Sequence, residues 1–233
     1  MYSRSHRGVA VRLLLAVILA APGVPAAGAA STDDPLVAAV RAGAAAVGQP
    51  PAFERTTMVT RGGATQTRVE RFDPRAPEGQ RWVLVAIDGA PPPARERDQF
   101  AQAMREARPP GYWRMALLLA DGASRVPGDG EAILRVAPLP AAALDGQARA
   151  FADRLVAEMR LTPGERPQVR EARVFAPAPM RRGPARLGSF ETVSRFAPGP
   201  GGTPRLEAQT SRMVISLLGR EMTITTRSTY RYL

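Results

Sequence analysis

The chain has 233 residues, and its 32 basic side chains, all arginines, outnumber 21 acidic ones to give a net charge of +11. It contains no cysteine and no lysine, and its single histidine is His6. These absences exclude disulfides, Cys/His zinc sites and the nucleophilic schemes that depend on cysteine, lysine or a histidine beyond the first residues. Carboxylates, hydroxyls and arginines remain for any chemistry.

The first 30 residues have the order of a secretory signal peptide. Three arginines without an acidic residue open the chain, an apolar run follows over residues 13–21, and small residues then lead to Ala29. We expect cleavage near Ala29–Ser31. An uncleaved anchor is the weaker alternative, because the apolar run rises only about 15 Å as a helix, about half of the hydrocarbon core of a bilayer.

Export is therefore the expected fate of the chain, to the periplasm or outside the cell. No later segment is long and apolar enough to span a membrane. The remaining chain stays basic, so it is attracted to anionic lipid head groups at a membrane surface, and nucleic acid is not expected as a partner in that compartment.

The first elements are a small helix and a hairpin. Asp34 can cap a helix and Pro35 suits its first turn, which predicts a helix over residues 35–47. Two strand-like runs, 53–61 and 65–73, flank a Gly-Gly pair and predict a β-hairpin. A third strand is expected over residues 81–88.

The middle of the chain is mixed. Residues 94–107 have an apolar face at helical spacing and predict a second amphipathic helix. Residues 111–119 favour a strand, with a short buried helix as the alternative, and 131–137 predict a strand. Residues 148–162 fit either a helix or a strand, and the Pro-Gly turn after them favours a strand.

The last part of the chain alternates apolar and polar residues over long runs separated by short turns. Strands are predicted over residues 168–176, 185–196, 205–218 and 221–232. Successive strands with short connections are typical of an antiparallel meander.

These elements predict an α+β fold in one domain, residues 31–233, after the signal peptide at 1–30. We expect a strongly curved antiparallel sheet, a half-barrel meander of about eight or nine strands, because long strands twist and coil. The two amphipathic helices are expected to pack on its concave side.

This layout resembles the periplasmic lipoprotein-carrier type of half-barrel, the LolA/LolB-like proteins. In that family the sheet wraps around helices and holds acyl chains, which implies a lipid or lipoprotein as the ligand. The chain departs from the LolB-like acceptors in having no cysteine to be acylated, which points to a soluble carrier. The likeness is carried by element order and by the local strings Phe53-x-Arg55, Glu70-Arg71-Phe72-Asp73-Pro74 and Trp82.

Two groups of residues are candidates for ligand contact. Arg181 and Arg182 could bind anionic head groups, although a solvated sheet face is the simpler interpretation. Aromatic and methionine side chains could line an apolar cavity, since methionine is common at adaptable binding surfaces, although plain core is the favoured interpretation. These candidates are Phe53, Phe72, Trp82, Trp113, Met115, Met213 and Met222.

The main hypothesis is a non-enzymatic, exported binding or carrier protein for an apolar ligand such as a lipid or an acylated peptide. The alternative is an accessory or scaffold subunit that contacts another envelope protein. A carboxylate-based hydrolase using Asp73, Asp88 or Asp121 is least favoured, because Asp beside Pro or Gly is ordinary turn chemistry. No cofactor or metal site is predicted.

Overall fold

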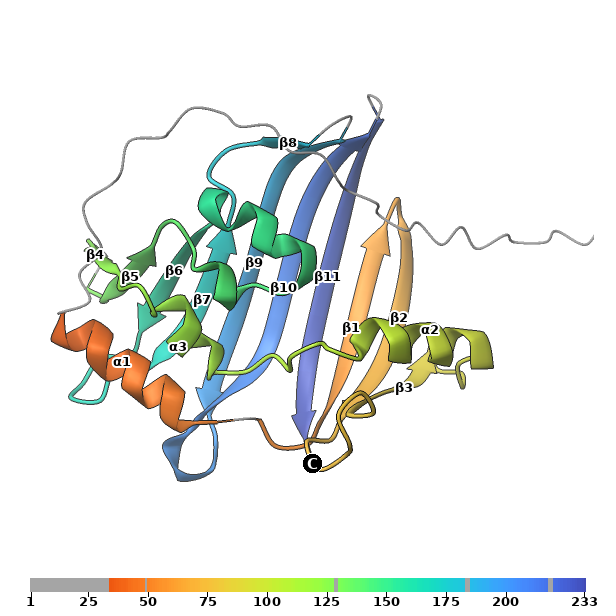
Figure 1. Ribbon diagram of the computed structural model, residues 1–233, viewed down its shortest axis with the longest axis horizontal. Coiled ribbons are helices and arrows are strands. Elements are labelled where there is room, and N and C mark those ends of the chain that lie inside the picture. The colour runs from red at the N-terminus through yellow and green to blue at the C-terminus, as the bar shows by residue number, and fades with distance from the viewer. Residues whose placement is uncertain (1–33, 49, 128–129, 183–184, 218–219) are drawn as a thin grey trace, which may run out of the picture.

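The computed structural model describes residues 34–233 except 49, 128–129, 183–184 and 218–219, so the predicted signal peptide lies outside the described residues. The described chain forms one eleven-stranded sheet, with its helices on one side (Figure 1). The α-helices are α1 (Pro35–Ala46), α2 (Ala94–Met104) and α3 (Arg114–Leu118), and 3₁₀ turns η1 to η3 cover Ala141–Ala143, Gly146–Arg154 and Pro200–Gly202. The strands are β1 (Phe53–Arg61), β2 (Ala64–Phe72), β3 (Trp82–Ile87), β4 (Ser124–Val126), β5 (Ile133–Val136), β6 (Val156–Leu161), β7 (Val169–Phe175), β8 (Met180–Arg182), β9 (Ala185–Pro198), β10 (Pro204–Leu217) and β11 (Arg220–Tyr232).

The sheet consists of two antiparallel meanders joined where the first strand pairs with the last. Its order is β3-β2-β1-β11-β10-β9-β7-β6-β5-β4, with β8 beside β9. The curved sheet is open, because β3 and β4 are its two edges (Figure 1). The α+β class and the curved antiparallel sheet are as predicted. The strand number exceeds the expected eight or nine; β4 and β8 have three residues each, which is too short to show an alternating pattern.

The predicted strand over residues 111–119 is wrong, because this segment contains the helix α3. Met115, Leu118 and Leu119 are each at most 5% exposed, and they pack against α1. A short apolar run that is buried on all sides has no periodicity that distinguishes a strand from a helix. Here the helical form allows the segment to pack against α1. The ambiguous residues 148–162 divide between both forms, since η2 ends at Arg154 and β6 begins at Val156.

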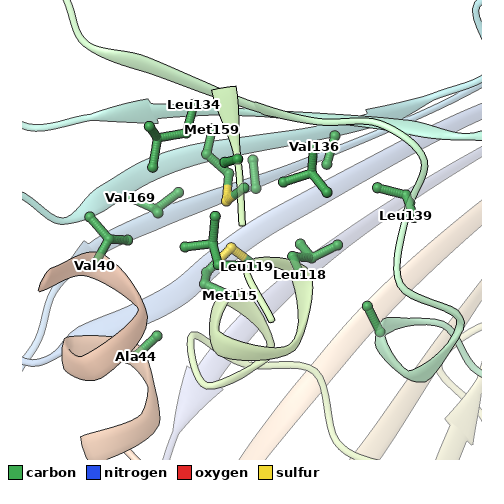
Figure 2. Packing of buried hydrophobic residues seen from close by; sticks show 14 of the residues in the cluster. Val40, Ala44, Met115, Leu118, Leu119, Leu134, Val136, Leu139, Met159 and Val169 are labelled. Atoms are coloured by element: carbon green, nitrogen blue, oxygen red, sulfur yellow. The ribbon is translucent and has the colours of Figure 1, made fainter. Parts of the chain in front are cut away.

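The larger core lies between α1, α3 and the half of the sheet from β5 to β7. Val37, Val40 and Ala44 recur at helical spacing on α1 and are at most 1% exposed. Figure 2 shows Met115 of α3 and Met159 of β6 facing each other in the centre of this cluster. The helices α1 and α3 therefore form the inner layer that covers this half of the sheet.

A second, smaller core lies at the lower ends of β1, β2 and β3 in Figure 1, under α2. Phe53 stacks on Phe72 with ring centroids 5.3 Å apart and meets the edge of Trp82 at 5.6 Å. Phe100 and Met104 of α2 cover this aromatic cluster. No described residue at the upper ends of β10 and β11 belongs to either core.

Candidate functional site

The inner face of the central strands is arranged in rows, because antiparallel register places partner residues side by side on one face. The lowest rows are aromatic and charged. Arg55 is opposite Glu70 on β2 and opposite Tyr230 on β11. The Arg55 guanidinium binds the carboxylate of Glu70, which is almost fully buried, and lies 4.7 Å from the centre of the Trp82 ring.

A band of hydroxyl and amide side chains crosses the middle of the same face. The hydroxyls of Thr57 and Ser228 lie 3.0 Å apart, and Gln209 donates to Ser194 over 3.0 Å. One row further up, Thr192 donates to Ser211 over 3.1 Å. These hydroxyl and amide groups satisfy one another across the strands, and the row of Thr57 continues on β2 to Arg68.

Above this band the inner face becomes apolar. Phe190, Met213 and Ile224 occupy one row, and Leu187, Ile215 and Met222 occupy the next. All six are half-buried, and Leu187 and Phe190 also pack against the larger core. Across the upper ends of β11, β1 and β2 no helix of the described chain is drawn in Figure 1. We call this set the upper apolar patch: Leu187, Phe190, Met213, Ile215, Met222 and Ile224.

A charged pocket of ≈ 230 Å³ lies below the polar band, between the sheet and the segment that joins α2 to α3. Arg108 and Arg114 both bind Asp145 there, and both also donate to backbone carbonyls. Burial raises the pKa of Asp145, but the hydrogen bonds and charges of the two arginines outweigh it, so the net pKa is lowered. The guanidinium donors of Arg108 and Arg114 thus bind groups of the chain itself, and these contacts hold the segment that joins α2 to α3 in place.

The structure places the sequence-predicted residues in three different settings. Phe53, Phe72, Trp82 and Met115 are at most 5% exposed and belong to the two cores. Trp113 is half-buried and lines a separate pocket of ≈ 150 Å³ beside four prolines. Only Met213 and Met222 belong to the upper apolar patch.

The two predicted head-group arginines lie on β8, at the upper end of the sheet. Arg181 is exposed and pairs in register with Arg186 of β9, whereas the side chain of Arg182 lies outside the described part of the structure. Sequence reasoning missed four patch residues, although alternation identified their strands. Alternation of apolar and polar residues distinguishes the two faces of a strand, but it does not show which part of a face the helices leave uncovered.

The turn carboxylates have local partners. Asp73 binds Arg75 two residues later, and the side-chain hydrogen bond from Arg75 lowers the pKa of Asp73. Asp88 accepts a hydrogen bond from the backbone N–H of Thr67 at 2.7 Å. The described residues contain no group of three or more carboxylates that could hold a metal ion, and none of their helices is long and apolar enough to cross a bilayer.

Comparison of the chain with family models, with curated proteins and with solved structures found no match.

Proposed function

We propose that this chain is an exported binding or carrier protein that holds an apolar ligand, a lipid or an acylated peptide, on the upper apolar patch. The observation that carries the proposal is the patch itself. Six large apolar side chains lie in two adjacent rows on the inner face of β9, β10 and β11. The two on β9 pack against the larger core, and no described helix is drawn over the upper end of β11 in Figure 1. Contiguous apolar surface that stays partly exposed marks binding sites.

The surroundings of the patch support an apolar ligand over a polar one. The polar band below it is internally hydrogen-bonded, so it offers few free groups to a polar ligand. Met213 and Met222 supply flexible thioethers, which adapt to ligands of varied shape. The proposal includes two expectations from the sequence that agree with it: the resemblance to the lipoprotein-carrier half-barrels and the signal peptide.

The experiment is native mass spectrometry of the protein purified from the envelope, with lipid extraction of the same sample. A co-purifying acyl species is the expected result. Binding of the neutral fluorescent probe N-phenyl-1-naphthylamine then tests the place of binding in Met213→Gln. A buried amide without partners costs about 1–3 kcal/mol, so affinity should fall about tenfold.

The matched control is Val193→Gln, which makes a comparable change on the outer face of β9. Val193 is half-buried and is opposite Thr210 in the register. Its variant should bind the probe like the unaltered protein. A clean apo mass together with equal probe affinities in both variants would refute the proposal.

A second candidate function, contact with another envelope protein, is favoured by the edge strand β3. Val83 and Val85 are 52% and 36% exposed on its outer face, and an edge strand offers unpaired backbone groups to an added strand. If this edge binds a partner, a protein recovered by cross-linking from envelope extracts should be lost in Val83→Lys. Recovery unaffected by the lysine would exclude β3 as the contact.

A further inference from the structure

Three arginines lie on the same inner face as the upper apolar patch. Arg61 is opposite Ile224 in the register, and Arg220 precedes Met222 by two residues, so both lie on the face of the patch. Arg68 is opposite Thr57 and lies at the level of the polar band. We call Arg61, Arg68 and Arg220 the upper arginines.

The contacts of these arginines are with neutral groups. The Nε of Arg61 lies 2.7 Å from the thioether sulfur of Met222, which joins its guanidinium directly to the patch. The Nε of Arg68 donates to the amide oxygen of Gln66 at 2.9 Å. Within the described residues, none of the three forms an ion pair.

Several other arginines of the sheet are paired with carboxylates. Lower on the inner face Arg55 pairs with Glu70. On the outer face Arg173 pairs with Glu191, and Arg195 pairs with Glu171 at 3.2 Å. Arg212 and Arg227, on the outer face, also form no ion pair among the described residues, so what distinguishes Arg61 and Arg220 is their place beside the upper apolar patch.

On its inner face, the described upper end of the sheet carries positive charge without a carboxylate beside it. The described strand positions on the inner face above the row of Glu70 contain no acidic residue. Arg181 and Arg186, which pair on β8 and β9, lie on the outer face and are not part of this group.

We propose that the ligand of the upper apolar patch is a single-chain amphiphile with an anionic phosphate head group, and that the upper arginines select it. This inference rests on the proposed function and adds the ligand class. The acyl chain lies on the two apolar rows, and the head group meets Arg61 and Arg220 at the rim. Guanidinium groups suit this role because they bind phosphate oxygens with paired N–H donors.

The test compares two ligands that share one acyl chain, myristoyl lysophosphatidylglycerol and myristoyl lysophosphatidylcholine, by titration below their micelle concentrations. The net-anionic lipid should bind about tenfold more tightly at low salt, because its head group gains exposed charge contacts with Arg61 and Arg220. The preference should shrink in about 1 M salt, where charges are screened beyond about 3 Å.

The double variant Arg61→Gln/Arg220→Gln should lose most of this preference and keep its affinity for the choline lipid. The matched control is Arg212→Gln/Arg227→Gln, which removes two exposed arginines from the outer face of β10 and β11. It should leave both affinities unchanged. Glycerol 3-phosphate, which has the head group without the chain, should not compete.

Four outcomes overturn the inference. Equal binding of both lipids would exclude the role of the upper arginines, and so would a preference that survives in Arg61→Gln/Arg220→Gln. Both results leave the proposed function standing. Competition by glycerol 3-phosphate would show a free-phosphate site instead of an amphiphile site. Binding of neither lipid, with no loss of probe binding in Met213→Gln, would remove the proposed function as well.

Discussion

The ion pair between Arg55 and Glu70 is the most buried charge contact of the described residues. Their side chains are 18% and 7% exposed. The Tyr230 hydroxyl lies near this pair, is buried without a hydrogen bond of good geometry in the described structure, and burial raises the pKa of Tyr230. The pair therefore places two opposite charges between the aromatic cluster and the polar band, and among the described residues each charge is neutralised only by the other.

Substitution of Glu70 by Gln is expected to destabilise the fold by about 1–3 kcal/mol, because it leaves the Arg55 charge buried without a counter-charge. Urea unfolding monitored by tryptophan fluorescence measures this loss. Glu207→Gln is the control, since Glu207 is exposed and forms no ion pair within the described residues. Equal stability of the two variants would contradict the expectation.

At the scale of elements, the start of α1 is fastened to the edge strand β4. Asp34 caps α1 by accepting from the backbone N–H of Leu36 at 2.8 Å. Its carboxylate also binds Arg125 of β4, with Nε 2.6 Å from Oδ2. The hydrogen bond from Arg125 is the main reason why the pKa of Asp34 is lowered from 3.8 to about 2.

The pH dependence of this contact follows from the direction of the shift. A carboxyl whose pKa is lower in the folded state stabilises the fold above its unfolded pKa, and the contribution is lost as the pH falls through the folded pKa. Asp34→Asn keeps a capping side chain and removes the charge. The stability difference between the protein and this variant should therefore be full above about pH 5 and shrink between pH 3.8 and about 2.

Denaturant unfolding of both proteins at a series of pH values measures that difference. A control is Asp121→Asn, because Asp121 is exposed and has no ion pair among the described residues. Its difference from the unaltered protein should stay small throughout. A pH-independent difference for Asp34→Asn would show that the charge of Asp34 does not contribute.

At the scale of the whole molecule, β11 is the strand that joins the two meanders. It pairs with β1 from Phe53↔Tyr232 to Arg61↔Ile224 and with β10 on its other side. The backbone N–H of Leu233 also donates to the carbonyl of Ala52 at 2.9 Å. The upper apolar patch and the upper arginines both include residues of β11.

Removal of residues 220–233 should therefore abolish cooperative unfolding, because it exposes two new strand edges and separates the β1–β3 hairpins from the rest of the sheet. Near-ultraviolet circular dichroism and urea unfolding detect the loss. Removal of Leu233 alone, which is 59% exposed, is the control and should leave a cooperative transition. A cooperative transition in the longer truncation would show that β11 is dispensable.

The sequence by itself determined the elements whose signals are local. The Gly62-Gly63 pair between two β-rich runs predicted the hairpin of β1 and β2, and Asp34-Pro35 predicted the start of α1. Alternation over many residues predicted β9, β10 and β11 close to their observed bounds. These signals depend on backbone preferences and on a two-residue period, so no distant contact is needed to read them.

Only the tertiary structure decided which residues of those elements form the candidate site. Met213 and Met115 look alike in sequence, yet one lies half-buried on the inner face and the other lies in the core. The pairing of the first strand with the last, and the places that α1, α2 and α3 cover, determine which end of the sheet stays open. Such choices depend on contacts between residues far apart in the chain, whose free energy no local pattern encodes.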